Sequence, residues 1–237
     1  MSLVLDEHRE YLSDPVRLGA YERAIPEVVR PGDVVLDLGA GTGILGLLAC
    51  RAGAAWVYAI EETSLIGLTR ELARANQLGD RITHIKEYSA HVALPEPVDV
   101  VVCDQIGRFG LEAGLIENYD DVRRRLLKPG GRLVPAALEL SVAPVERPDL
   151  AAQIEFWMSR PAGFDFTPAR AIAANTGYPC AFEPGDLLSA PAVSGRIDLA
   201  REAPRPVRLE ARLSIARAAP CTGSAAGSPR RSPRRSR

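Results

Sequence analysis

An apolar run that leads directly into a glycine-rich turn constrains the fold of this chain more than any other feature. Residues 34–38 read Val-Val-Leu-Asp-Leu, and Gly-Ala-Gly-Thr-Gly follows at residues 39–43, where a helical pattern begins. Glycine adopts positive φ without strain and has no Cβ, so the backbone N–H groups that open the helix can approach a polar ligand closely. We therefore expect a ligand-binding turn between a buried strand and a helix.

The second apolar run ends in an acid. Glu61 follows residues 55–60, and a carboxylate at this place can accept hydrogen bonds from both hydroxyls of a ribose. The turn lacks the third glycine of the fingerprint G-x-G-x-x-G, which argues against NAD. The arrangement of Asp37, Gly39 and Gly41 resembles the S-adenosylmethionine (SAM) site of class I methyltransferases. The alternative is a tight strand-to-helix turn that binds no ligand.

Strand and helix patterns alternate through the first half of the chain. The alternation predicts an α/β fold with a doubly wound, Rossmann-like parallel sheet. The expected strands are 34–38, 56–61, 82–86 and 98–103, and the expected helices are 43–52, 65–77 and 117–127.

Composition excludes several classes of protein. The chain has 237 residues and 46% hydrophobic residues, enough for one full core and part of a second. No apolar run approaches the ~20 residues of a membrane span, and the N-terminus lacks a signal peptide, so we expect a cytoplasmic protein without a membrane partner. The four cysteines form no C-x-x-C, and we expect reduced thiols and no metal. Abundant Arg, Ala, Gly and Pro indicate a GC-rich, bacterial coding sequence.

The charge is unevenly distributed. The formal charge of the chain is −1, and the six arginines after Ala216 account for +6, so residues 1–216 carry −7. An acidic body suits a cationic substrate, although the same charge also serves solubility. An arginine-rich tail can attract nucleic-acid phosphate without specificity. We regard nucleic acid as the less favoured partner.

The residues before the first strand carry a second pattern, which reads H8-x-x-x-L12-x-D14-x-V16-R17-x-x-x-Y21. Together with the glycine-rich turn, this pattern resembles the protein arginine methyltransferases. The resemblance implies that N-terminal helices fold over SAM, that His8 lies beside it, and that Arg17 pairs with its methionine carboxylate. A bidentate guanidinium is a strong partner for a carboxylate. The alternative is a solvated Arg17 on an amphipathic helix.

The resemblance covers roughly residues 8–200, with departures in the acceptor site. The family's two substrate-binding glutamates align with Asp104 and with Ala113, and Glu112 stands next to the second position. We expect Asp104 and Glu112 to hold the acceptor. The acid on the adenine side aligns with Ala90, and Ser89 beside it is our candidate for that role.

Other departures concern the ends of the chain. Gly163-Phe164-Asp165 resembles the start of the family's dimerisation arm, which implies a possible homodimer, and the loop that closes the family's active site has no counterpart. We expect cofactor-covering helices in 1–30, a SAM-binding domain in 31–137, a partial β-barrel and arm-like region in 138–216, and a disordered Arg/Ser/Pro tail in 217–237. The tail has the composition of a truncated or frame-shifted end.

The function expected from the sequence is SAM-dependent methyl transfer to a nitrogen nucleophile, such as a protein arginine guanidinium. Two alternatives stay open. One is a methyltransferase of small molecules or of other protein groups on the same fold. The other is a catalytically idle SAM-binding or scaffold protein.

Overall fold

The computed structural model describes residues 2–107, 109–111, 113–201, 206–217 and 220–227, which form two compact units. Of the described residues, the first unit contains the chain up to Leu138 and those between Ile197 and Val207, and the second contains Glu139–Arg196 and those between Arg208 and Gly227. The boundary after Leu138 lies one residue from the boundary expected from the sequence.

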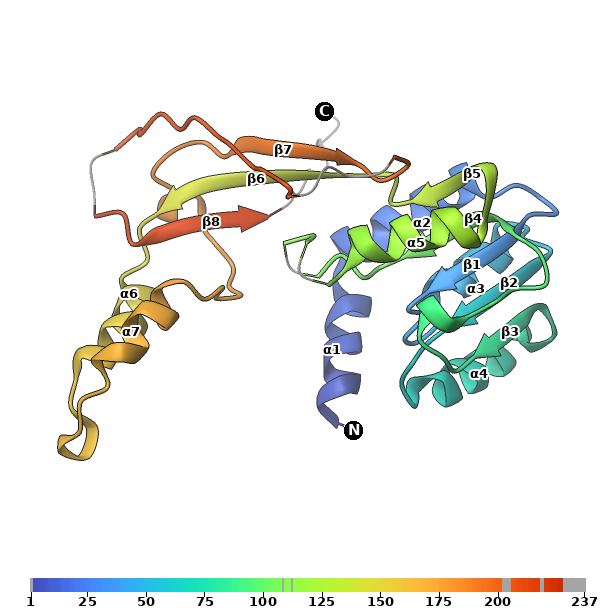
Figure 1. Cartoon of the computed structure of the whole chain (residues 1–237), viewed down its shortest axis with the longest axis horizontal. Helices are drawn as coiled ribbons and strands as arrows, with labels where there is room; N and C mark the ends of the chain where they lie inside the picture. Colours follow the sequence, from blue (N-terminus) through green and yellow to red (C-terminus); the bar gives the residue numbers. More distant parts are fainter. Residues whose placement is uncertain (1, 108, 112, 202–205, 218–219, 228–237) are drawn as a thin grey trace, which may run out of the picture. The chain divides into compact units, whose positions relative to one another are not determined.

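The first unit is built on a five-stranded sheet with the strand order β3-β2-β1-β4-β5, and all its strand pairs are parallel. Figure 1 shows β1 between β2 and β4, where the chain order reverses. This arrangement confirms the predicted α/β fold, and ligands of such sheets bind at the carboxyl ends of the strands beside the reversal. The strands are β1 Val34–Leu38, β2 Trp56–Ile60, β3 Ile82–Ile85, β4 Val98–Cys103 and β5 Leu127–Val134.

Helices complete the first unit. They are α1 Ser2–Ser13, α2 Pro15–Val28, α3 Ile44–Arg51, α4 Leu65–Ala75 and α5 Leu115–Arg125, with the short 3-10 helices η1 Gly79–Arg81 and η2 Ser89–His91. The three helices expected from the sequence, now α3, α4 and α5, each begin and end within two residues of their predicted bounds. Two short helices precede the first strand, as the sequence predicts.

The core explains why the central strands are apolar throughout. Leu36 in β1 pairs with Tyr58 in β2 and with Val101 in β4, and both Leu36 and Val101 are fully buried. Parallel sheets of this class have helices on both faces, so their strands read as continuous apolar runs. Ile25 of α2 and Ala49 of α3 belong to one buried cluster with Val35 of β1.

The second unit contains a three-stranded sheet and a helical hairpin. The sheet has the order β7-β6-β8, and β6 pairs antiparallel with β8. Helices α6 and α7 pack against one another. The elements are β6 Ala137–Val145, β7 Ala192–Asp198, β8 Gly223–Gly227, α6 Pro148–Glu155, α7 Thr167–Ala174, η3 Phe156–Met158, η4 Pro161–Gly163 and η5 Pro184–Asp186.

Strand β8 lies within the range that the sequence predicts to be disordered. Gly223–Gly227 pairs with β6 from Ser141 to Val145. The segment has small side chains and no apolar period, and its pairing uses the backbone, which carries donors and acceptors whatever the side chain. The expectation of disorder is therefore wrong for these five residues, while residues 218–219 and 228–237 lie outside the described ranges.

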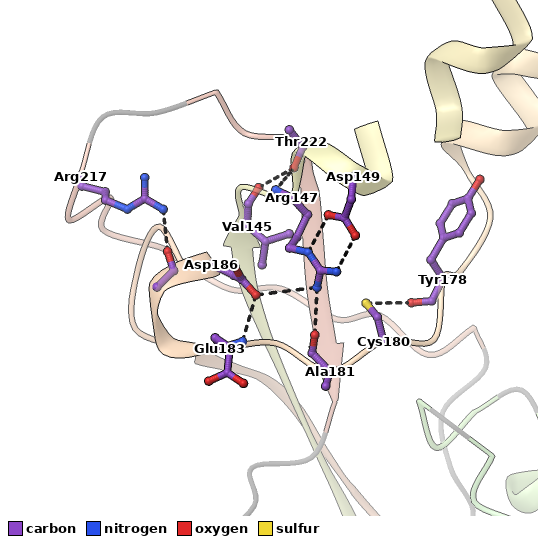
Figure 2. Close-up of polar contacts among 11 residues, drawn as sticks. Val145, Arg147, Asp149, Tyr178, Cys180, Ala181, Glu183, Asp186, Arg217 and Thr222 are labelled. Atoms are coloured by element: carbon purple, nitrogen blue, oxygen red, sulfur yellow. Dashed lines mark hydrogen bonds and ion pairs between the residues drawn. The ribbon is translucent and has the colours of Figure 1, made fainter. Parts of the chain in front are cut away.

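A single arginine ties the start of α6 to the rest of the second unit (Figure 2). The Arg147 guanidinium donates to both carboxylate oxygens of Asp149, from Nε at 2.8 Å and from Nη2 at 2.7 Å. Its Nη1 donates to the Ala181 carbonyl at 2.9 Å, and its backbone N–H donates to Thr222 Oγ1 at 2.6 Å. One residue therefore links the hairpin, the loop at Ala181 and the start of β8.

Within the described part of the chain, no helix combines the length and the apolar character needed to cross a membrane.

The burial of Leu36 predicts its contribution to stability. Leu36→Ala should lower the free energy of unfolding by about 2–5 kcal/mol, because it removes apolar burial and leaves a cavity. Urea denaturation measures the change. The matched control is Leu5→Ala in α1, where Leu5 is 42% exposed, and its effect should stay below about 1 kcal/mol. Equal effects of the two substitutions would contradict the described core.

Candidate active site

A cavity of about 410 Å³ in the first unit brings together residues from α1, α2, the glycine-rich turn and the ends of the central strands. Small-molecule sites in proteins typically occupy about 300–1,000 Å³. The cavity is lined by, among others, His8, Arg17, Asp37, Gly41, Glu61 and Asp104. With Gly39, which also lines the cavity, seven of the residues that the sequence assigns to cofactor or acceptor surround one space.

The glycine-rich turn forms one wall of the cavity. Gly39, Gly41 and Gly43 all have positive φ, and Gly43 is the N-cap of α3. A Cβ at Gly41 would lie 2.4 Å from His8 Cε1. The imidazole of His8 in α1 therefore lies directly against the turn, and only glycine leaves room for it.

Glu61 lies at the end of β2 with its carboxylate in the cavity wall. The residue is 8% exposed, and its oxygens accept hydrogen bonds from the backbone N–H of Gly41 at 3.0 Å and of Thr63 at 2.9 Å. An ionised carboxylate has about four acceptor positions. Two of them remain for the hydroxyls of a ribose.

Asp37 is the most buried acid of the site. It is 1% exposed, and its Oδ2 accepts one hydrogen bond, from Gly46 N–H at 2.8 Å. Burial raises the pKa of Asp37 to about 7, and the carboxylates of Asp104 and Glu61 add to the rise, while the Gly46 hydrogen bond opposes it. Asp37 therefore binds the first turn of α3 and is only partly ionised near neutral pH.

Arg17 is fixed by the first turn of α2. Asp14 is the N-cap, and its side chain accepts hydrogen bonds from the backbone N–H of Val16 and Arg17, while Pro15 pre-sets the first helical φ. This local motif explains why a helix begins here and why the Arg17 side chain enters the cavity.

The Arg17 guanidinium is paired with Asp104. Arg17 Nε lies 3.0 and 2.9 Å from the two carboxylate oxygens, and Nη2 lies 2.8 Å from Oδ1 and 3.0 Å from the Asp104 carbonyl. The sequence analysis assigns these residues to different ligands, Arg17 to the cofactor and Asp104 to the acceptor. The structure adds a direct bond between them that no spacing in the sequence indicates.

Three further residues of the cavity were not among the candidates from the sequence. The Tyr11 ring lies under the Arg17 guanidinium, with Cζ 4.0 Å from the ring centroid. Tyr21 donates from its hydroxyl to the Cys103 carbonyl at 2.9 Å, and its burial raises its pKa. Gln105 accepts a hydrogen bond from Asn118 at 2.9 Å. Tyr21 stands four residues after Arg17, so helical periodicity places both on one face, and Tyr11 aligns with the methionine that borders the substrate pocket in the protein arginine methyltransferases. Gln105 carried no such signal.

Ser89 and Glu112 are not among the described residues that line the cavity. Ser89 is buried in η2 and does not line the cavity, and its carbonyl accepts a hydrogen bond from Arg125. Glu112 lies outside the described residues, and Ala113 beside it lines the cavity. The assignments of Ser89 and Glu112 stay predictions. Across the described ranges, no cluster of three or more His, Cys, Asp and Glu residues is suited to a metal ion.

Comparison with known proteins identifies two groups of relatives. The family model described as ribosomal protein L11 methyltransferase (PrmA) matches residues 20–136. The chain is 36% identical over 152 residues to protein arginine N-methyltransferase 6 of Danio rerio, an alignment of 63% of this chain with 44% of that protein. It is 40% identical over 149 residues to protein arginine N-methyltransferase PRMT10 of Oryza sativa subsp. japonica, covering 62% of this chain and 39% of that protein.

Solved structures show the same fold. The Trypanosoma brucei PRMT1 enzyme-prozyme heterotetrameric complex with AdoHcy superposes with a TM-score of 0.74 at 24% identity, covering 82% of this chain and 62% of that chain. Arabidopsis thaliana protein arginine methyltransferase 10 superposes with a TM-score of 0.72 at 26% identity, covering 84% and 64%. The chain spans less than half the length of the two curated relatives and less than two thirds of these structures.

The raised pKa of Asp37 predicts a pH dependence of stability. Below about pH 4 the carboxyl is protonated in the folded and unfolded chain, and between about pH 4 and 7 only the folded chain keeps the proton. Stability should therefore fall as pH rises through this window, by up to about 1.4 kcal/mol per pH unit. Asp37→Asn should flatten this part of the profile in urea denaturation between pH 4 and 8. The exposed control Asp80→Asn should leave the slope unchanged, and an unaltered slope in Asp37→Asn would contradict the prediction.

Proposed function

Because this chain is similar to the protein arginine N-methyltransferases and has the class I methyltransferase fold, we propose that it is a SAM-dependent methyltransferase. Its acceptor is a nitrogen nucleophile such as a protein arginine guanidinium. One observation carries the proposal. The glycine-rich turn, Glu61, Arg17 and Asp104 line a single cavity at the carboxyl edge of the sheet.

The polar groups of the cavity match those of SAM. Glu61 has free acceptor positions for the ribose hydroxyls, and Arg17 offers a guanidinium to the methionine carboxylate. His8 lies against the turn and covers the space from the α1 side. Bound SAM supplies an electrophilic methyl group on a cationic sulfur. The protein's task is to hold that group in line with the acceptor and to exclude water.

The acceptor half of the site depends on Asp104. Arg17 occupies part of its carboxylate, and the remaining lone pairs can accept a second cationic donor. In the transfer, the sulfur–methyl bond breaks, a nitrogen–methyl bond forms, and the acceptor nitrogen loses a proton to a carboxylate or to solvent. Glu112 remains the candidate for a second carboxylate.

One observation favours a changed acceptor. Ala113, at the position of the family's second glutamate, lines the cavity without a charge. A small-molecule or other protein acceptor, or an idle SAM-binding scaffold, is therefore the second candidate function.

We also propose a homodimer with a protein acceptor. The hairpin of the second unit carries exposed apolar side chains, including Phe164 at 70% and Ile172 at 72% exposure, and such patches mark interaction sites. The T. brucei relative forms a heterotetrameric complex. A cytoplasmic location and a bacterial source remain predictions from the sequence.

Mass spectrometry after incubation with SAM carrying a trideuterated methyl group tests the transfer. A panel of arginine-containing peptides should gain one or more labelled methyl groups, and the same peptides with lysine in place of arginine should gain none. Labelling of both sets, or of metabolites alone, would favour the changed acceptor. SAM binding without any labelled product would favour the idle protein.

Calorimetry with AdoHcy, the demethylated product, tests the cofactor half separately. Glu61→Gln should weaken AdoHcy binding by about 1–3 kcal/mol, because it removes a charged acceptor from two ribose hydroxyls. Glu62→Gln, at the exposed neighbouring position, is the matched control and should bind as the wild type does. An unchanged affinity in Glu61→Gln would show that Glu61 serves only the backbone of the turn.

A further inference from the structure

We propose that Tyr11 is a positioning residue for the cofactor carboxylate. The Tyr11 ring and Asp104 together hold the Arg17 guanidinium in a clamp, and among the described residues its Nη1 has no acceptor and is available to a carboxylate ligand. This inference rests on the proposed function, which assigns Arg17 to SAM.

The first half of the clamp is the contact between the Tyr11 ring and the guanidinium. Arg17 Cζ lies 4.0 Å from the centroid of the Tyr11 ring, well inside the ~6 Å within which a cation is attracted to an aromatic face. Arg17 is only 18% exposed at its side chain, so this contact is shielded from water. With Arg17 Cζ held over the ring, the contact limits the positions that the guanidinium can adopt.

The second half of the clamp acts on one edge. Nε and Nη2 of Arg17 donate to Asp104, which occupies the inner edge of the fork. Within the described part of the chain, no residue accepts a hydrogen bond from Nη1. A guanidinium has five N–H donors, and because Nη2 also donates to the Asp104 carbonyl at 3.0 Å, the two N–H groups of Nη1 are the donors that remain for a carboxylate ligand.

Tyr11 is itself held in place on α1. Its hydroxyl donates to Glu7 Oε1 at 2.5 Å, one helical turn earlier, and the His8 ring lies edge-on to it with centroids 6.1 Å apart. Glu7, His8 and Tyr11 all line the cavity. The Tyr11 ring is therefore held in place, and its contact with Arg17 restricts the rotation that a long arginine side chain would otherwise keep. Removal of the Tyr11 ring should weaken binding of the ligand carboxylate, which Arg17 holds in the proposed function. Binding of the adenine and ribose should not change.

Two ligands separate this role from a general structural one. AdoHcy carries the amino acid carboxylate, whereas 5′-deoxy-5′-methylthioadenosine keeps the adenine, the ribose and the thioether and lacks the amino acid. Calorimetry on the full chain should show that Tyr11→Leu weakens AdoHcy binding roughly three- to tenfold. Its affinity for methylthioadenosine should stay unchanged. Tyr11→Phe keeps the ring and loses only the hydroxyl, so it should retain most of the AdoHcy affinity.

Arg17→Lys is the reference variant, because it keeps the positive charge and loses the planar guanidinium. It should weaken AdoHcy binding and leave the affinity for methylthioadenosine unchanged. Thermal unfolding of each variant verifies that it is folded. An equal loss for both ligands in Tyr11→Leu, or no loss for either, would overturn the role of Tyr11. Failure of the wild type to bind either ligand would instead overturn the proposed function. Retention of AdoHcy affinity by Tyr11→Leu beside a selective loss in Arg17→Lys would overturn the clamp alone.

Discussion

The ion pair between Arg17 and Asp104 is the interaction on which the arrangement of the site depends. It joins α2 to the carboxyl end of β4 across 87 residues of sequence and occupies both oxygens of the carboxylate. A partly buried charge needs a partner, and each residue supplies it for the other. Because Tyr11 contacts the same guanidinium, the position of α1 against the sheet follows from this pair as well.

Three acids, Asp37, Glu61 and Asp104, line the cavity. Burial raises the pKa of Asp37, and the negative charges of Asp104 and Glu61 add to the rise. Backbone N–H groups of the glycine-rich turn and of α3 offset this charge through Gly41 and Gly46. An acidic site of this kind attracts cations. This property suits the proposed function, in which both the sulfonium of SAM and a guanidinium acceptor are cationic.

Local patterns in the sequence predicted most of the first unit. Periodicity gave the strands and helices, the glycine spacing gave the turn, and Glu61 lies where a strand-end acid was expected. Contacts between distant residues were beyond such patterns, because neither Arg17 with Asp104 nor Arg17 with Tyr11 has a fixed spacing. Strand β8 escaped prediction for a different reason, since its pairing depends on the backbone of β6 and its small side chains carry no period.

The links made by Arg147 have a consequence for how the chain tolerates changes in length. Its backbone N–H is satisfied by Thr222, and its guanidinium is shared between Asp149 and the Ala181 carbonyl. A chain cut before residue 220 would leave that N–H without its acceptor at the base of the helical hairpin. A fusion partner or tag attached after Gly227 would leave the hydrogen bonds of Arg147 intact. An insertion in the loop before β8 would disturb the bond to Thr222.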